Sequence, residues 1–489
     1  MQHESQRVRG AGRAGRLLSL LDAGQCETIH AATLTILERT GVRLEHPGGV
    51  ELLATAGATA EGDRVRIPRS LVDWALETAP SSVTLYDRRG SPAMVLAGTR
   101  TYCGPGSDCM NIVDHRTGQR RQPLLTDVED AAALCDRLEH IDFVMSGFLP
   151  ADVDRAVADR HQLRVMLNRT AKPLVFVAYD LSGCEDAVAM GEAVAGGRRA
   201  LGERPFLACY VNPATGLLHD RDAVAKLLFL AERRIPFVYA PGCIAGVTGP
   251  ATVAGSVAVI NAGMLAGLVL SQLVREGAPV IVRGWGGGGL DARTTVYGYA
   301  GPDSRRAATF MAAFYDLPAF GLAGASDAKL VDQQAAAEAA LTLAVDTLAG
   351  PDMIHDLGYL ESGMSGSLTL LTICDQILAW LRRYTEPLDV SEDSLAVGLT
   401  DTVGPDGQYL SERHTAAHWR AMWRPALFER ERYEGWAAGG ATTLVERAAR
   451  RVDELLAAPN ERRLPADVDA ALAGIVAAAE REHGSVARP

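Results

Sequence analysis

The chain has 489 residues, of which 48% are apolar and 22% charged, as expected for a globular protein with a sizeable core. The formal net charge of −12 and the lack of a Lys/Arg run interleaved with aromatic residues argue against a nucleic-acid-binding surface. Eight cysteines are scattered without a CxxC pair, a pattern that fits reduced thiols and offers no four-cysteine zinc site. The basic start followed by a short LLSLL run does not resemble a signal peptide, so we expect a cytoplasmic protein.

Residues 1–100 are predicted to form an N-terminal α+β extension. The segment 26–41, CETIHAATLTILERTG, has the apolar spacing of a helix. The segments 64–80 and 83–90, RVRIPRSLVDWALETAP and VTLYDRRG, indicate a small hairpin-like region.

Short apolar runs alternate with helical stretches over residues 101–400. Five of these runs are rich in β-branched and aromatic residues and open with a proline, which a strand tolerates at its first position. They begin at Pro173, Pro205, Pro236, Pro279 and Pro318. The segments 142–149 and 351–360 are two further strand candidates, and 395–398 is an eighth. Two of the intervening helices are predicted to start with capping boxes, Thr126 with Glu129 and Ser182 with Glu185.

Continuous apolar strands that alternate with helices are typical of parallel strands covered on both faces. No GxGxxG fingerprint and no Walker loop occurs in the sequence, which disfavours a doubly wound nucleotide-binding sheet. We therefore predict an α/β fold, a (β/α)8 TIM barrel over residues 101–400. Residues 401–489 are predicted to form a C-terminal helical extension.

One segment, 250–274, is uncharged and long enough to cross a bilayer. Polar residues interrupt it at Thr252, Ser256, Asn261 and Gln272, and strand candidates bracket it on both sides. We interpret it as a Gly/Ala-rich helix buried against the sheet, and expect no membrane contact.

Two histidines in the C-terminal extension, His414 and His418, have the i,i+4 spacing that can bind a metal. No third ligand lies near them in the sequence, and no glutamate stands between them. They are interpreted as one face of a helix, and no metal is expected.

The stretch RGWGGGGLDARTTVYGY, residues 283–299, follows the apolar run that starts at Pro279. In a barrel, chemistry sits at the C-terminal ends of the strands, and glycine lets the backbone approach a ligand closely. The stretch is therefore predicted to be a loop that forms one wall of a substrate cavity. The alternative is a flexible loop without a ligand.

Trp285, Tyr297 and Tyr299 are predicted to offer their aromatic faces to a cation. Arg293 is predicted to hold a carboxylate through two parallel hydrogen bonds. The alternative for Arg293 is a purely structural pair with Asp291.

Other strand ends add candidates for the same cavity. Phe148 leaves the first strand candidate, Tyr210 leaves the third, and His355 ends the last. A lone histidine is more often a satisfied core residue, but the C-terminal end of a barrel strand favours a role in ligand binding.

Four long blocks of the sequence resemble the corrinoid-dependent trimethylamine methyltransferase family, in order, from about residue 16 to residue 455. The blocks are IHAATLTILERTGVRLEHP, GPATVAGSVAVINAGMLAGLVLSQLVREGAPVIV, SDAKLVDQQAAAEAALTLAVDTLAG with IHDLGYLESGM, and VGPDGQYLSERHTAAHWRAMWRPALFERERYEGW. The resemblance implies a (β/α)8 barrel and a homo-oligomer. It also implies transfer of a methyl group from a methylamine to the cobalt of a corrinoid (cobalamin) carried on a separate small protein.

The trimethylamine enzymes of that family carry pyrrolysine, whereas the matching segment here, 334–338, offers only alanines between Gln334 and Glu338. This departure argues against trimethylamine as the substrate. Family members without pyrrolysine include demethylases of glycine betaine and related quaternary amines. Such a substrate needs an aromatic cage and a carboxylate clamp, and it needs no zinc.

Several loops are expected to face the cognate corrinoid protein. They carry Gly286, Gly287, Gly288, Asp327, Gln333 and Glu361. Two other functions stay open: transfer from a different methyl donor, and a non-catalytic barrel that binds a betaine or a corrinoid protein.

Overall fold

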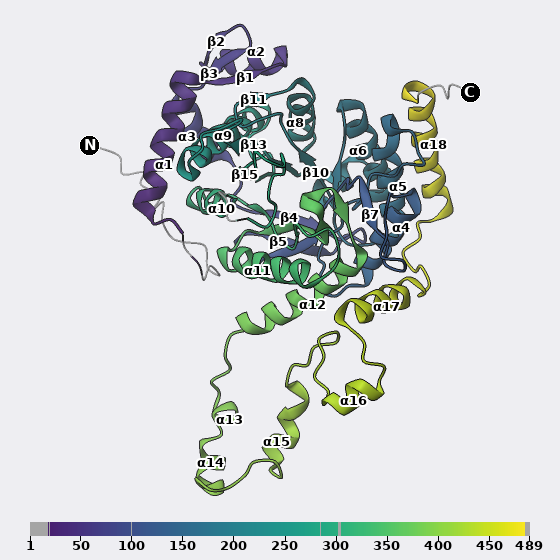
Figure 1. Ribbon diagram of the computed structural model, residues 1–489. Coiled ribbons are helices and arrows are strands. Elements are labelled where there is room, and N and C mark those ends of the chain that lie inside the picture. The colour runs from purple at the N-terminus through teal and green to yellow at the C-terminus, as the bar shows by residue number, and fades with distance from the viewer. Residues whose placement is uncertain (1–17, 19, 99, 284, 302–304, 485–489) are drawn as a thin grey trace.

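The computed structural model describes residue 18 and residues 20–98, 100–283, 285–301 and 305–484 (Figure 1). The side chains of Trp285, Arg305 and Arg306 lie outside that description.

The N-terminal part consists of helices and two hairpins, and residues 69–78, predicted as part of a hairpin-like region, are instead a helix. The first helix follows Asp22, whose carboxylate accepts a hydrogen bond from the Gln25 backbone amide, while the Asp22 backbone amide donates to the side-chain oxygen of Gln25. The elements are α1 (Ala23–Thr35), a π-helical turn (Ile36–Thr40), β1 (Val42–Leu44), α2 (Pro47–Thr55), the hairpin β2 (Thr59–Glu61) and β3 (Arg64–Arg66), α3 (Arg69–Thr78), and the hairpin β4 (Val83–Tyr86) and β5 (Pro92–Leu96).

Four of the proline-opened runs form one parallel sheet. Its strands are β9 (Leu174–Val177), β10 (Leu207–Val211), β12 (Phe237–Tyr239) and β14 (Val280–Val282), in the order β14-β12-β10-β9. Nearly all of their residues are buried, because helices cover one face and core side chains fill the other. The prediction that these runs are adjacent parallel strands is confirmed.

A second parallel group has the order β16-β17-β6 and consists of β6 (Tyr102–Pro105), β16 (Phe320–Leu322) and β17 (Met353–Leu357). Single parallel bridges, Val144 with Leu174 and Val282 with Ala319, join the two groups.

The segment 142–147 runs beside β6. The Asp142 amide donates to the Cys103 carbonyl at 2.6 Å, and the Gly147 amide donates to the Gly106 carbonyl at 2.9 Å. Because the Val144 bridge ties the same segment to β9, it lies between β6 and β9.

The predicted strand at 395–398 is wrong. That segment contains the end of α13 (Glu392–Leu395) and the start of α14 (Val397–Val403). Its short apolar run meets no partner strand there, whereas β6 has partners on both sides. The β6 sequence YCGP carries no β-branched residue, so only its pairing identifies it as a strand.

Helices follow the strands and pack outside them. They are α4 (Leu125–Arg137), α5 (Ala158–Arg169), α6 (Leu181–Ala195), α7 (Arg198–Glu203), α8 (Arg221–Arg233), α9 (Val253–Val274), α10 (Arg305–Phe314), α11 (Gln333–Ala349) and α12 (Leu368–Thr385).

Both predicted capping boxes are wrong. Helix α6 is capped by Asp180, which accepts from the Gly183 amide at 2.7 Å, because the Ser182 hydroxyl is engaged by Arg160. Helix α4 begins at Leu125, where the Asp127 carboxylate accepts from the Leu124 amide at 2.7 Å. In both cases a carboxylate near the helix start satisfies the backbone better than the predicted hydroxyl.

Helix α9 is long and apolar enough to span a membrane, but 78% of its most apolar stretch is buried within the protein. It packs against α1, α3 and α8. A Cβ atom at Gly263 would overlap the Gly216 carbonyl, and one at Gly267 would overlap the Tyr239 ring. The interpretation of 250–274 as a buried helix is confirmed.

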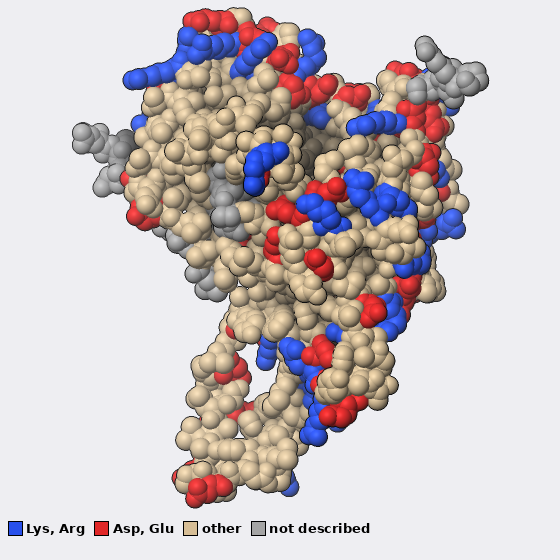
Figure 2. All heavy atoms as spheres, viewed as in Figure 1, with Lys and Arg blue, Asp and Glu red and all other residues tan. Residues whose placement is uncertain are grey.

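After α12 the chain leaves the body as an arm, residues 386–441, which carries α13, α14, α15 (Arg413–His418) and α16 (Tyr433–Ala438) (Figure 1). The chain then returns through α17 (Leu444–Leu456), which packs on α4 and α12, and α18 (Ala466–His483), which packs on α5 and α6. Acidic and basic side chains are intermixed on the face seen in Figure 2.

The close approach of α9 to the sheet predicts a clear cost for one added methyl group. Gly267→Ala forces the methyl group into the Tyr239 ring and should lower the free energy of unfolding by about 1–3 kcal/mol. Gly474→Ala in α18 is the control, because no atom lies within 4 Å of the added Cβ. It should leave stability unchanged or raise it by about 0.4–1 kcal/mol in urea denaturation. Equal stability of the two variants would contradict the packing of α9.

Candidate functional site

A cavity of about 260 Å³ opens at the carboxyl ends of the parallel strands. Aromatic residues, one arginine and one Asp–His pair dominate its lining. The lining residues are Ser107, Met145, Tyr210, Asn212, Arg283, Tyr297, Tyr299, Leu322, His355, Asp356, Tyr359 and Gly363.

Four tyrosines form the aromatic part of the wall. Tyr297 and Tyr299 meet edge to face with ring centroids 6.3 Å apart, and Tyr299 lies nearly parallel to Tyr359 with centroids 6.5 Å apart. Tyr210 contributes a fourth ring, 5.7 Å from the His355 ring. Electron-rich ring faces attract a cation most strongly where water is excluded.

The Asp356 carboxylate is the buried anion of the cavity. Its Oδ1 lies 2.7 Å from Nδ1 of His355, and its Oδ2 accepts a 3.0 Å hydrogen bond from the Tyr299 hydroxyl. Burial by itself raises the pKa of this carboxyl, but His355, the Arg283 charge and the Tyr299 hydroxyl outweigh burial, so the pKa is lowered. Asp356 is therefore ionised at neutral pH.

Two backbone features hold Asp356 in place. Its own φ of 71° lies in the left-handed region, which is rare for a non-glycine residue. A Cβ atom at Gly106 would overlap both the Asp356 carboxylate and the Tyr359 hydroxyl, so only glycine fits there. Backbone strain of this kind is concentrated at functional sites.

Arg283 is the buried cation of the cavity, with 5% of its surface exposed. Its guanidinium lies 5.3 Å from the centroid of the Tyr210 ring and 6.0 Å from that of Phe320. No role for Arg283 was predicted from the sequence. The available signal is an arginine directly at the carboxyl end of a wholly apolar strand, because a charge is rarely buried there without a functional partner.

Asp327 anchors the backbone of the loop that carries Tyr299. The Asp327 carboxylate accepts from the Tyr299 amide at 2.7 Å, the Ala300 amide at 3.2 Å and the Ser362 hydroxyl at 2.7 Å. Glu338 in turn accepts from the Asp327 amide at 2.8 Å. The carboxylate of Asp327, predicted to face the corrinoid, is thus used to position a cavity tyrosine.

The glycine run is a strand, and its prediction as a loop is wrong. Residues Trp285–Gly289 form β15, which pairs in parallel with β13 (Gly242–Ala245), because the extended backbone finds hydrogen-bonding partners there. A Cβ atom at Gly288 would lie 3.0 Å from the Tyr297 ring, so glycine makes room for the ring. The side chain of Trp285 lies outside the described structure.

Four of the predicted ligand-binding residues meet in the cavity: Tyr210, Tyr297, Tyr299 and His355.

Two others lie elsewhere. Arg293 has 87% of its side chain exposed and pairs with Asp291 at 2.8 Å, which is the structural alternative for this residue. Phe148 is buried against Gly366 and does not line the cavity.

Two further residues predicted to face the corrinoid are not among the lining residues of the cavity. Gln333 is the first residue of α11. Glu361 lies two residues after the cavity residue Tyr359 and accepts from Arg120 at 2.8 Å and from Ser365 at 2.7 Å.

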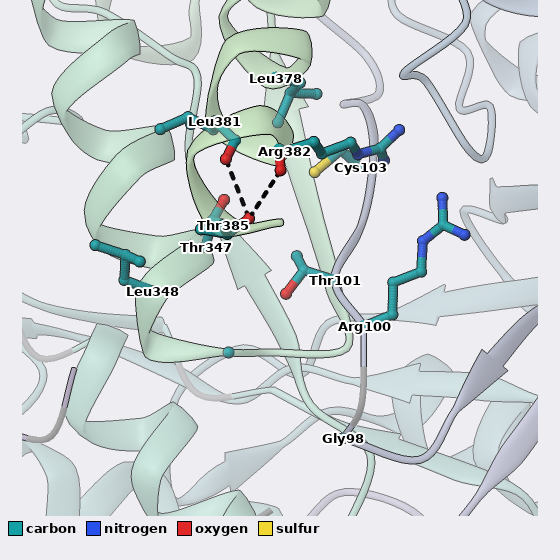
Figure 3. Close-up of a pocket in the computed structure, with 11 residues that line it drawn as sticks. Gly98, Arg100, Thr101, Cys103, Thr347, Leu348, Leu378, Leu381, Arg382 and Thr385 are labelled. Atoms are coloured by element: carbon teal, nitrogen blue, oxygen red, sulfur yellow. Dashed lines mark hydrogen bonds between the residues drawn. The ribbon is translucent and has the colours of Figure 1, made fainter. Parts of the chain in front are cut away.

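A second cavity, of about 340 Å³, lies at the opposite, amino-terminal edge of the strands (Figure 3). Its charged lining residues are Arg100 and Arg382, and Arg382 pairs with Asp142 at 2.6 Å. Burial raises the pKa of the Cys103 thiol, the lining thiol, which is therefore no nucleophile at neutral pH. This cavity suits neither a cation nor nucleophilic chemistry.

The sequence model of one protein family, described as Trimethylamine methyltransferase (MTTB), matches residues 1–484. The trimethylamine methyltransferase MttB of Desulfitobacterium hafniense DCB-2 is 30% identical over 98% of this chain and 96% of its own length. A glycine betaine methyltransferase of D. hafniense Y51 is 30% identical over 96% of this chain and 99% of its own. Trimethylamine methyltransferase MttB of Methanosarcina barkeri is 27% identical over 92% and 93%.

Solved structures give the same picture of the fold. The crystal structure of M. barkeri monomethylamine methyltransferase (MtmB) covers 91% of this chain and 89% of its own, with 12% identity and a TM-score of 0.51. A hydroxylamine MtmB complex covers 90% and 89%, with 11% identity and a TM-score of 0.52. At these identities the likeness concerns the fold alone, a mixed α/β architecture.

The ionised state of Asp356 gives a pH-dependent prediction. Asp356→Asn should lower the free energy of unfolding at pH 7 by about 3–5 kcal/mol, because it leaves buried charges without their partner. Since the pKa of Asp356 is lowered on folding, its stabilisation is complete above the unfolded pKa of about 3.9 and is lost as the pH falls further. The difference between the two proteins in urea denaturation should therefore shrink below pH ~3.9.

Asp291→Asn is the matched control, because it removes an exposed carboxylate that also pairs with an arginine. It should leave stability at pH 7 nearly unchanged. A stable Asp356→Asn variant would show that Asp356 is not the ionised partner of this cluster.

Proposed function

This chain belongs to the trimethylamine methyltransferase family, and on that basis we propose that it transfers a methyl group from a carboxylated quaternary amine, such as glycine betaine, to a corrinoid protein. The observation that carries the proposal is the pairing of opposite charges in one aromatic cavity. Arg283 and Asp356 line the same cavity as four tyrosines. Glycine betaine is a zwitterion with a methylated cation at one end and a carboxylate at the other.

The cationic end of the substrate fits the tyrosine wall. Each ring face contributes about 0.5–2 kcal/mol to binding of a quaternary ammonium. The ionised Asp356 carboxylate, which accepts a hydrogen bond from the Tyr299 hydroxyl, adds a negative charge that attracts the cation. It forms no direct bond to the methylated nitrogen.

The carboxylate end fits Arg283, whose planar guanidinium binds a carboxylate through two parallel N–H···O bonds. Stacking on the Tyr210 ring orients the guanidinium in the cavity. The amide of Asn212 also lines the cavity and offers a further donor. We give Arg283 the clamp role that the sequence suggested for Arg293.

The chemistry needs placement more than proton transfer. The C–N bond breaks with its electron pair remaining on nitrogen, so a neutral tertiary amine leaves and no proton moves. Reduced cobalt of the partner's corrinoid supplies the nucleophile for the methyl carbon. The residues of this chain bind the substrate, hold one methyl group toward the opening and exclude water from the rings.

Two of the lining residues, Ser107 and Gly363, are small and leave room for the corrinoid of the partner. A side chain at Gly363 would crowd the Tyr299 ring. The strand with Gly286, Gly287 and Gly288, together with the turn at Glu361, stays our proposed contact region for the corrinoid protein.

Trimethylamine is the substrate named for several relatives, but Arg283 argues against it here. Trimethylamine has no carboxylate, and in its protonated form it would bring a second positive charge beside the buried guanidinium.

Methyl transfer to a Co(I) corrinoid, followed by absorbance, tests the proposal. Glycine betaine should support transfer, whereas trimethylamine should not. The proposal fails if no betaine of a broad panel gives transfer.

Variants of two arginines test the clamp. Arg283→Ala should raise the half-saturating glycine betaine concentration at least tenfold, the equivalent of losing about 1.4 kcal/mol. Choline, a quaternary amine without a carboxylate, should not lose affinity in this variant. Arg293→Ala should behave like the wild type, because its exposed side chain pairs with Asp291 outside the cavity. The reverse order of the two variants would assign the clamp to Arg293.

We further propose that eight parallel segments close into a (β/α)8 barrel. In support, β16, β17 and β6 pair in order, the segment 142–147 bonds to β6 and bridges to β9, and Val282 bridges to Ala319. An experimental structure in which 142–147 is unpaired on one side would contradict it. The division into residues 1–100, 101–400 and 401–489 stays a prediction.

We infer a cytoplasmic location, supported by the eight cysteines, all of them buried free thiols, and by the burial of α9.

We also infer a homo-oligomer in which the arm contacts a second copy of the chain. No residue of α13, α14, α15 or α16 is buried, and several large apolar side chains of the arm are exposed. These include Leu388, Val390, Leu395, Val397, Leu410 and Met422. Large exposed apolar groups gathered on one segment mark a protein contact.

The origin of the arm favours a second copy over the corrinoid protein as its partner. Helix α12 ends beside Asp142, at the amino-terminal edge of the strands, because its Arg382 pairs with that residue. The substrate cavity opens at the opposite edge.

Charge substitutions in the arm test this contact. Leu388→Asp combined with Leu410→Asp should reduce the molar mass measured by light scattering to that of one chain, because both side chains are at least 80% exposed and serve no core. Leu341→Asp, an exposed leucine of α11, should leave the mass unchanged. A wild-type monomer at micromolar concentration would contradict the oligomer.

A further inference from the structure

The arm contains a cluster of three metal-ligating side chains, Asp393, His414 and His418. Asp393 lies in α13, and the two histidines lie one turn apart in α15. In the sequence about 20 residues separate Asp393 from His414. No third ligand for the two histidines lies near them in the sequence, and the fold of the arm brings Asp393 to them.

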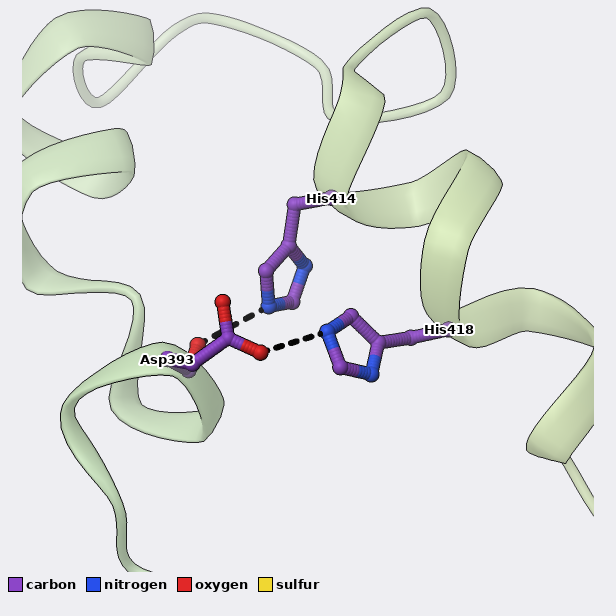
Figure 4. A group of neighbouring side chains, drawn as sticks. All are labelled: Asp393, His414 and His418. Atoms are coloured by element: carbon purple, nitrogen blue, oxygen red, sulfur yellow. Dashed lines mark hydrogen bonds and ion pairs between the residues drawn. The ribbon is translucent and has the colours of Figure 1, made fainter.

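The two imidazole rings converge on Asp393 (Figure 4). His418 Nε2 lies 3.0 Å from Asp393 Oδ2, and His414 Nε2 lies 3.0 Å from the backbone carbonyl oxygen of the same residue. The ring centroids are 4.3 Å apart. One ligand atom from each side chain lies within 4.8 Å of the other two, so small rotations bring all three onto one ion.

The donor set specifies the class of metal. Two imidazole nitrogens and one carboxylate oxygen are typical ligands of Zn²⁺, whereas Ca²⁺ and Mg²⁺ prefer oxygen ligands alone. Three protein ligands leave one tetrahedral position for water or for a group of a neighbouring molecule. Among the residues that the structure describes, this is the one cluster of at least three such side chains with convergent ligand atoms.

The surroundings favour a site that is prepared for a cation. Asp389, just before α13, accepts from the Ser394 hydroxyl and from the Ser391 amide and hydroxyl, which fixes the loop that leads to Asp393. The Asp389 carboxylate is also close enough to His418 to interact with it electrostatically. Two carboxylates therefore attract a cation to this point.

The helices of the arm also lack the tertiary packing that would stabilise them. Helices α13, α14 and α15 have four, seven and six residues, and none of their residues is buried. Helices this short are marginal in water without tertiary support. A bound metal ion is one of the devices that stabilise a segment lacking a hydrophobic core.

We propose that Asp393, His414 and His418 bind one Zn²⁺ ion, which links α13 to α15 and stabilises the conformation of the arm. The site is separate from the substrate cavity and takes no part in methyl transfer. The competing explanation is that the two histidines only donate hydrogen bonds to Asp393, in which case the cluster has no special affinity for a metal.

Titration of the full chain with Zn²⁺ separates the two explanations. The wild type, freed of metal with a chelator, should bind one Zn²⁺ per chain in calorimetry, and Co²⁺ in its place should give the absorption bands of a tetrahedral ion. His414→Gln combined with His418→Gln should weaken this binding at least about tenfold. Asp393→Asn is the second variant, since it keeps both histidines and the shape of the aspartate.

Limited proteolysis reports on the shape of the arm. Zn²⁺ should slow cleavage within residues 386–441 in the wild type at least about tenfold and should have no effect in the double histidine variant. His161→Gln is the matched control. The His161 side chain is 17% exposed and pairs with a single carboxylate, that of Glu480, at 3.0 Å. This variant should bind Zn²⁺ and be protected like the wild type.

Two results would overturn the proposal. One is a wild type that binds no Zn²⁺. The other is Zn²⁺ binding that stays unchanged in both the double histidine variant and Asp393→Asn, which would locate the ion elsewhere. Circular dichroism and methyl transfer of each variant show whether it is folded, so that loss of binding is not confused with unfolding.

Discussion

The site depends on one buried carboxylate. Asp356 lies at the end of a parallel strand, where it receives the Tyr299 hydroxyl and pairs with His355. The charge of Asp356 offsets the cost of burying the Arg283 guanidinium, and the same carboxylate accepts a hydrogen bond from the Tyr299 hydroxyl. Without this anion, the guanidinium and the hydroxyl would each lose a stabilising interaction, although Asp327 would still hold the backbone of the Tyr299 loop. The charge balance of the cavity and the position of the Tyr299 ring therefore depend on it.

The sequence predicted the parts of the fold that are encoded locally. Apolar strands opened by proline, such as those at Pro205 and Pro236, carry their own signal, and so does the uncharged helix 250–274. The strand β6 did not, because YCGP becomes a strand only through its neighbours. The caps of α4 and α6 were missed for a related reason: a distant arginine, Arg160, engages the hydroxyl of Ser182 that was expected to cap α6.

The candidate site was predictable where residue type and strand position coincide. Tyr210 and His355 satisfy both conditions and line the cavity together with Tyr297 and Tyr299 from the segment after β15. Arg293 lies in that same segment, but its side chain turns to the neighbouring Asp291. Contacts between residues far apart in the chain were out of reach of the sequence. The meeting of Gly106 with Asp356 and that of Asp393 with two histidines are of this kind.

Three of the cavity tyrosines pack against glycine residues, which have no side chain. The ring or hydroxyl of Tyr359 faces Gly106, that of Tyr297 faces Gly288, and that of Tyr299 faces Gly363. Each glycine and its tyrosine thus form a complementary pair in which one partner is large because the other has no Cβ atom. A Cβ atom at Gly106 would overlap the Tyr359 hydroxyl, and one at Gly288 or Gly363 would crowd its ring at 3.0 to 3.2 Å. A change in the size of one member is therefore best accommodated by a change in the other, so paired replacements are the route by which such a cavity changes its shape and its substrate range.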